Sequence, residues 1–183
     1  MKVLIDACVL YPTVVREVLL KSAAAGVFTP LWSARILEEW RRAAARLNPV
    51  AAAQAEAEIA LVKARWPEAE VDPKPSDEAR LYLPDENDVH VLASAIAGSA
   101  DVLLTVNIKD FPRGTLYEEG IRRDEPDHFL TSHFVQQPEV VKAAVAEVWD
   151  RAKTMEGCPP NQRALLRKAR LPRLAKALTN LEY

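Results

Sequence analysis

The sequence has 183 residues, a formal net charge of −2 and two cysteines. A chain of this length can bury the core of one ordinary domain plus a small appendage, so it needs no disulfides for stability. The near-neutral charge excludes a global attraction to nucleic acid or anionic lipid, and any site for a polyanion must be local. Cys8 and Cys158 lack CxxC spacing, no signal-peptide pattern precedes them and the apolar runs are short, which predicts a reduced, cytoplasmic protein with no membrane insertion.

Strand and helix patterns alternate through the first part of the chain. Gly26 and Gly98 are placed to end two helices, while Ser33 and Asp85 are placed to cap two others. The predicted elements are a strand over 2–6, a helix over 13–26, a strand over 27–32, helices over 34–47 and 50–65, a loop over 68–79, a helix over 86–97 and a strand over 101–106.

This alternation predicts an α/β layer fold with a mainly parallel central sheet and right-handed crossovers. From about Gln136 onward no strand pattern returns. A strong amphipathic helix is followed by a CPPN break and a basic helical pair interrupted by Pro172. The predicted domains are therefore 1–135 and a helical C-terminal extension, 136–183.

Ligands of an open α/β sheet gather at the carboxyl ends of its strands. Asp6 directly follows the first predicted strand, although a lone Asp there is often only a turn former or cap. In the helix over 34–47, a rotation of about 100° per residue places Glu39 beside the apolar stripe and turns Glu38 away. That stripe consists of Ile36, Trp40, Ala43 and Leu47.

The helix over 86–97 carries a second inward acid, Asp88, whereas Glu86 and His90 lie on its other side. An inward carboxylate is costly unless something compensates it. First-turn amides and the helix dipole do so, which leaves open the interpretation that Asp88 only completes a cap with Asp85. His90 is predicted to be a surface residue and not a metal ligand. The stripe that contains Asp88 is formed by Val91, Leu92 and Ala95.

The strand over 101–106 leads to Asn107 and Asp110 at its carboxyl end. Like charges brought close together repel one another and raise their own pKa values unless a cation neutralises them. Oxygen ligands without an adjacent His or Cys cluster suit Mg²⁺ or Mn²⁺ and not Zn²⁺. The predicted metal-binding acids are Asp6, Glu39, Asp88 and Asp110.

Two local runs of positive charge have two possible interpretations. Residues 163–176 contain six Lys or Arg side chains and no acid, and residues 40–46 add Arg41, Arg42 and Arg46. Such runs are commonly the solvated faces of helices. A phosphate-binding rim is the alternative.

Five motifs occur in order over roughly residues 1–135. They are VLIDACVLYP at the start, S-x-x-I-L-E-E around Glu39, D-x-x-D-x-H-V-L-A-S-A around Asp88, T-V-N-I-K-D-F-P from Thr105, and PDHFL at 126–130. The ordered set resembles the PIN-domain nucleases, in particular the VapC-like toxins of bacterial toxin–antitoxin pairs.

The resemblance implies a PIN-like three-layer α/β/α fold and hydrolysis of RNA by a metal-activated water, with Asp6, Glu39 and Asp88 as metal-binding acids. The family's fourth acidic position falls on Asn107, and Asp110 matches the second Asp of that segment. Because Asn107 keeps an oxygen that can weakly coordinate a cation, weaker binding of a second ion is expected, not a dead site.

Further roles are expected around this site. Thr105 can hydrogen-bond a carboxylate or the attacking water, and Lys109 and Arg113 can contact substrate phosphate. The resemblance also implies a cognate antitoxin that covers the acids, and a homodimer is plausible.

Two other functions remain open. One is an Asp-based phosphoryl acceptor on a flavodoxin-like sheet, but only Asp6 stands at the first strand, where that class needs paired acids. The other is a degenerate PIN-like scaffold or RNA-binding module in which Asn107 has abolished catalysis.

Overall fold

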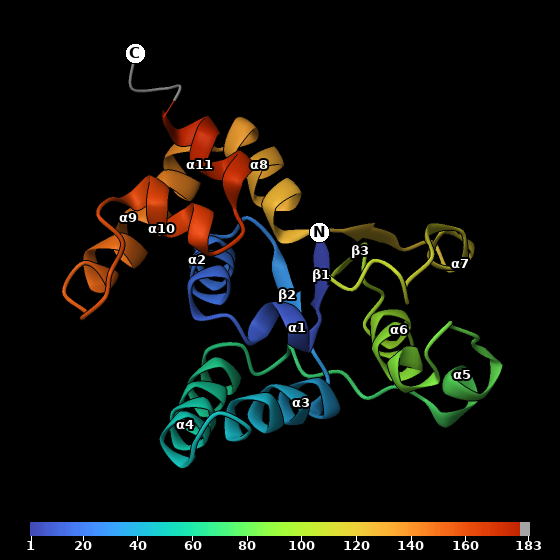
Figure 1. The fold of residues 1–183 in the computed structure, drawn as a ribbon. Coiled ribbons are helices and arrows are strands. Elements are labelled where there is room, and N and C mark those ends of the chain that lie inside the picture. Colours follow the sequence, from blue (N-terminus) through green and yellow to red (C-terminus); the bar gives the residue numbers. More distant parts are fainter. Residues whose placement is uncertain (180–183) are drawn as a thin grey trace. The chain divides into compact units, whose positions relative to one another are not determined.

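The computed structural model describes residues 1–179, and the chain divides into two compact units (Figure 1). The first unit comprises Met1–Tyr11 and Phe28–Asp124. The second comprises Pro12–Val27 and the chain from Glu125 onward. None of the helices within residues 1–179 has both the length and the apolar character that a membrane span requires.

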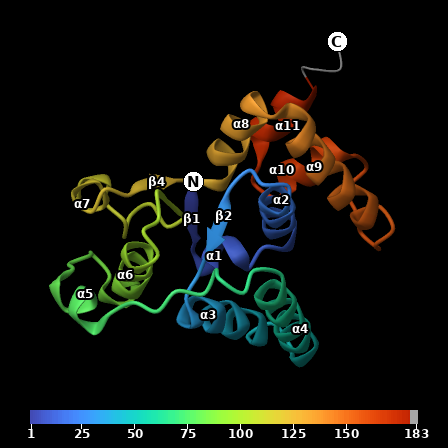
Figure 2. The same cartoon turned by 180° about the vertical axis from the view of Figure 1, so that it is seen from behind.

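The first unit is built on a parallel sheet with the strand order β2-β1-β3-β4 (Figures 1 and 2). The central strands are continuous apolar runs and are completely buried apart from Lys2, as expected for strands covered on both faces. The predicted α/β class with a mainly parallel central sheet is therefore confirmed. The strands are β1 (Lys2–Ile5), β2 (Thr29–Leu31), β3 (Val102–Leu104) and β4 (Arg122–Asp124).

Side-chain caps determine where several helices of this unit begin. Ser33 Oγ accepts the N–H of Ile36 at 3.4 Å, and Asn48 Oδ1 accepts the N–H of Ala51 at 2.8 Å. The helices are α1 (Ala7–Leu10), α3 (Ala34–Ala45), α4 (Pro49–Arg65), α5 (Pro75–Arg80), α6 (Val89–Ala97) and α7 (Arg113–Glu118), with a 3₁₀ turn over Glu86–Asp88.

Three local predictions need correction. The segment 68–79, predicted as a loop, contains most of α5, because Pro75 takes a first-turn position and Asp77 and Glu78 place negative charge in that turn. Leu47 does not belong to the buried stripe, because α3 already ends at Ala45 and Leu47 is 65% exposed. Helix α1 and strand β4 were not predicted, because α1 has only four residues and β4 has the polar sequence RRD without an apolar run.

The second unit is entirely helical within the residues described. Helix α2 packs on α9, and ion pairs join Lys21 to Glu147 at 2.6 Å and Arg151 to Glu17 at 2.8 Å. The predicted boundary at residue 135 stays a prediction, while contacts group α2 with the C-terminal helices. The helices are α2 (Thr13–Ala24), α8 (Pro126–Gln136), α9 (Pro138–Ala152), α10 (Gln162–Lys168) and α11 (Pro172–Thr179).

Candidate metal centre

The carboxyl edge of the sheet places two polar side chains of neighbouring strands together. The Asp6 N–H donates to the Leu104 carbonyl at 3.1 Å, and the Thr105 N–H donates to the Asp124 carbonyl at 3.1 Å. These bonds continue the ladders one residue beyond β1 and β3. Asp6 and Thr105 therefore lie at the edge where the sequence predicts a ligand site.

Asp6 is held by two donors on one oxygen. Thr105 Oγ1 donates to Asp6 Oδ2 at 2.6 Å, and Cys8 Sγ donates to the same oxygen at 3.0 Å. Burial, followed by the negative charge of Asp6, raises the pKa of the Cys8 thiol to about 12. Cys8 is thus a neutral thiol that donates to Asp6, and not a reactive thiolate.

A chain of hydrogen bonds connects Asp6 to Asp88. The backbone N–H of Asn107 donates to Thr105 Oγ1 at 3.0 Å, and Asn107 Nδ2 donates to Asp88 Oδ2 at 2.9 Å. Thr105 is completely buried, so its hydroxyl has a defined position between the two acids. Asn107 presents its amide nitrogen, not its oxygen, to Asp88.

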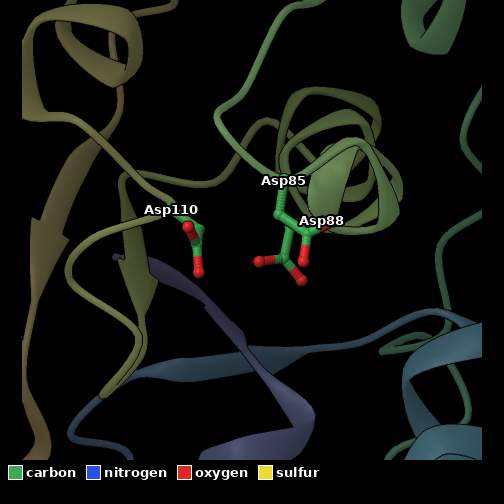
Figure 3. Close-up of side chains that lie close together, drawn as sticks. All are labelled: Asp85, Asp88 and Asp110. Atoms are coloured by element: carbon green, nitrogen blue, oxygen red, sulfur yellow. The ribbon is translucent and has the colours of Figure 1, made fainter.

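Three carboxylates lie together beside this chain of hydrogen bonds. Asp85 and Asp88 come from the turn that begins α6, and Asp110 comes from the loop after β3 (Figure 3). One carboxylate oxygen of each lies within 4.8 Å of the others. Among residues 1–179, no Lys, Arg or His forms an ion pair with any of the three. We call Asp85, Asp88 and Asp110 the acid cluster.

Asp85 is a member of the cluster that the sequence reasoning treated only as a cap. The cap exists, because Asp85 Oδ1 accepts the backbone N–H of Asn87 at 2.9 Å. The same oxygen also accepts Asn87 Nδ2 at 2.9 Å. The spacing of three residues between Asp85 and Asp88 was the available signal, since it brings two side chains to one side of a helical turn.

The acid cluster contains unbalanced negative charge. The pKa of Asp88 is raised from its ordinary value near 3.8 to about 6, first by burial and then by the surrounding carboxylates. These carboxylates belong to Asp6, Asp85, Asp110 and Glu39. A bound cation would remove this penalty.

Glu39 lies near these acids but is not part of the acid cluster. Its Oε1 lies 2.8 Å from His90 Nε2 and 3.5 Å from Arg35 Nε. The His90 contact does not have hydrogen-bond geometry, and it is an ion pair only when the imidazole is protonated. Arg35 also donates to the Asn87 carbonyl at 3.3 Å, which ties α3 to the turn that carries Asp88.

The prediction that His90 lies on the surface is wrong. His90 is only 2% exposed, and the buried positions of α6 include consecutive residues from His90 to Ala95. The helix is therefore covered on nearly all sides, and an amphipathic pattern does not identify an exposed face on it. On the neighbouring helix α3, Glu38 pairs with Arg41 and Arg42 of its own helix, whereas Glu39 contacts the buried His90.

The donor set of this site fits a hard divalent cation. Three carboxylates from two segments face one space (Figure 3), and carboxylate oxygens are the ligands that Mg²⁺ and Mn²⁺ prefer. Asp6 lies close enough for its charge to be the second cause of the raised Asp88 pKa. Lys109 and Arg113 are exposed on the loop and helix that follow, and the predicted phosphate contacts of both stay predictions.

Comparison with known proteins identifies the fold family. The PIN-domain family profile matches residues 2–109, which is more than half of the chain. This chain belongs to the PIN-domain family. A stretch of 63 residues is 36% identical to a protein named "Putative ribonuclease VapC50" from Mycobacterium tuberculosis (strain H37Rv). That match covers 34% of this chain and 37% of the relative, and among solved structures none is significantly similar.

The raised pKa of Asp88 predicts a pH-dependent stability without metal. Because the folded-state pKa of about 6 exceeds the unfolded value near 3.8, protonated Asp88 stabilises the fold below pH 3.8 and this contribution is lost as pH rises through 6. Asp88→Asn is expected to raise Tm in EDTA at pH 7 by about 2–4 °C, corresponding to about 1 kcal/mol after solvent screening.

Differential scanning fluorimetry between pH 5 and 8 would test this. Asp72→Asn, which neutralises an exposed acid of the same unit, is the control. Equal profiles of Tm against pH for the wild type and Asp88→Asn would show that the protonation of Asp88 does not affect the stability of the fold.

Proposed function

We propose that this PIN-domain protein is a Mg²⁺- or Mn²⁺-dependent endoribonuclease and the toxin of a toxin–antitoxin pair. The observation that carries the proposal is the convergence of unpaired carboxylates at the carboxyl edge of β1 and β3 in a chain of this family. The partial similarity to a protein named as a ribonuclease supports RNA as the substrate.

The proposed site residues have distinct roles. The acid cluster, with Asp6 beside it, would hold the cation. When bound, a divalent ion activates water and neutralises the non-bridging oxygens of a phosphodiester. Thr105 and Cys8 fix the Oδ2 atom of Asp6 by donating to it, which leaves Oδ1 as the atom available to a ligand. Glu39 would act on the site through Arg35 and His90 or through a coordinated water.

The bond changes of the proposed reaction are those of simple hydrolysis. The oxygen of water bonds to phosphorus as the bond from phosphorus to the 3′ oxygen breaks. One proton of water passes to the departing 3′ oxygen, so that the products are a 3′ hydroxyl and a 5′ phosphate. This pathway requires no protein nucleophile, consistent with a Cys8 thiol that is kept protonated by its high pKa.

A cognate antitoxin is the proposed protein partner. In support, Leu47, Val50 and Leu61 are 65%, 77% and 69% exposed at the end of α3 and along α4. An amphipathic partner helix can cover such side chains, and an Arg or Lys from the partner can neutralise the acids. A homodimer is a further prediction that sedimentation velocity would test.

Catalysis is tested by the cleavage of a panel of structured RNAs with Mn²⁺. We expect Asp6→Asn and Asp88→Asn to lower the rate by about 100-fold or more, because losing an outer-sphere partner alone typically costs 10–100-fold. The cut ends should carry 3′ hydroxyl groups, which distinguishes the reaction from contaminating nucleases that leave cyclic phosphates. A cooperative thermal transition with a Tm no lower than that of the wild type is the folding control for both variants. Absence of cleavage with any divalent ion would favour the degenerate RNA-binding alternative.

Asn107 provides a second test of the metal site. It occupies the position of an acid in the family and donates a hydrogen bond to Asp88. Asn107→Asp should raise Mn²⁺ affinity roughly tenfold, since affinity follows the number of charged oxygen ligands. It should also lower Tm in EDTA, because a further like charge joins the site. Calorimetry would measure the affinity, with Asn48→Asp at the start of α4 as the control for added charge. Unchanged affinity would show that this position does not contact the ion.

The antitoxin proposal is tested by co-expression with the small reading frame adjacent to the gene. A complex should co-purify, and Leu61→Glu should weaken it by placing a charge against an apolar partner. Ala53→Glu, at an exposed alanine of the same helix, is the control for added charge. Growth inhibition that the neighbour leaves unaffected would contradict the proposal.

A further inference from the structure

The second unit contains an exposed group of positive side chains with no acidic partners. All six belong to α10, α11 or the turn between them, and all six are exposed. None of them forms an ion pair with any other residue that the structure describes. They are Arg163, Arg167, Lys168, Arg170, Arg173 and Lys176, and we call residues 163–176 the basic segment.

Helical geometry keeps these charges away from the core. Leu165 and Leu166 of α10 are buried, as are Leu174 and Ala175 of α11. A rotation of about 100° per residue turns the cations of each helix toward solvent, opposite these apolar anchors. The cationic side chains are therefore attached to helices that buried residues anchor in the core of the unit.

Several other cations of the protein form ion pairs with acids. In the same unit, Lys21, Arg151 and Lys153 each pair with an acid. In the first unit, Arg41 and Arg42 pair with Glu38, so the basic run over 40–46 is largely neutralised. The basic segment differs from both, because none of its six cationic side chains has a described ion-pair partner in a protein whose formal net charge is −2. The nearest described acid contact is Asp127, which accepts the backbone N–H of Arg173 at 3.0 Å.

Arg170 provides a second, independent observation. It has a φ of 61°, and its N–H and that of Leu171 donate to the Arg167 and Leu166 carbonyls, the pattern that ends a helix with a left-handed residue. Gly is the usual residue in this position, because a side chain there costs roughly 1 kcal/mol. Gly26, Gly120 and Gly157 occupy three of the other left-handed positions, and Ser99, with a φ of 51°, occupies a fourth. Arg170 therefore places a long cationic side chain where a glycine would be less strained.

We infer that the basic segment is a binding surface for the phosphate backbone of single-stranded RNA. The inference rests on the proposed ribonuclease function for the identity of the polyanion. A row of unpaired Arg and Lys side chains binds a nucleic acid largely by releasing its counterions, without reading base sequence. The segment would therefore add affinity for RNA of any sequence, and the acid cluster would not be required for this binding.

The test is the affinity of the full-length protein for a fluorescent single-stranded RNA in EDTA, measured by anisotropy over a range of KCl concentrations. The triple variant Arg163→Gln, Arg167→Gln and Lys168→Gln should reduce the slope of log K against log salt by about 2 and weaken binding at low salt by about tenfold or more. Gln preserves helix propensity at these exposed sites, so Tm should change little.

The matched control removes the same charge from paired cations of the same unit. The triple variant Lys21→Gln, Arg151→Gln and Lys153→Gln should leave the salt slope near the wild-type value. Arg170→Gly should separate binding from stability, because it removes one phosphate contact, reducing the slope by about 0.7, while relieving the backbone and raising Tm. Equal slopes for the two triple variants would overturn the inference.

Binding to other polyanions tests the identity of the ligand, and binding combined with cleavage shows which of the two proposals fails. Stronger segment-dependent binding to phosphatidylserine vesicles or to polyglutamate than to RNA would replace RNA by a lipid or an acidic protein and overturn the inference. RNA binding in EDTA that depends on the basic segment, without cleavage in Mn²⁺, would contradict only the proposed nuclease. Cleavage combined with equal binding of both triple variants would contradict only the basic-segment inference.

Discussion

Repulsion among carboxylates at one edge of a parallel sheet is the constraint on which the proposed function depends. Asp88 is half-buried among four other acids, and burial followed by their negative charges raises its pKa to about 6. Neutral donors hold this arrangement, with Thr105 and Cys8 on Asp6 and Asn107 on Asp88. Because neutral donors orient the acids without cancelling their charge, the site keeps its attraction for a cation.

Neutral donors and basic side chains contact different acids around the site. Arg35 and His90 contact Glu39, which stands outside the acid cluster, while no described cation pairs with the cluster itself. Arg35 also binds the carbonyl of Asn87 and so links α3 to the turn that carries Asp85 and Asp88. Positive charge serves to position backbone near the site, and the carboxylates of the cluster remain available to a ligand.

The two units have opposite local electrostatics. The first holds the acid cluster, and the second holds the basic segment, whose six cations have no described ion-pair partner. A nearly neutral total charge conceals this division, which is why composition alone excludes only a global field. A polyanionic substrate is repelled by bare carboxylates, so a cation and a separate basic surface are complementary requirements of an enzyme that acts on RNA.

The sequence by itself determined the fold class, the strands β1 and β3 and the presence of acids at their carboxyl ends, because continuous apolar runs and strand-end positions are local properties. Helical rotation also predicted that Glu39 and not Glu38 can face the sheet; the two side chains are equally exposed, at 35% each, and differ in their partners. Only the tertiary structure decided which acids form the cluster, that Asp85 belongs to it, and that His90 is buried against Glu39. Those outcomes depend on distances between segments far apart in the chain, and on a helix covered on nearly every side, neither of which a one-dimensional pattern contains.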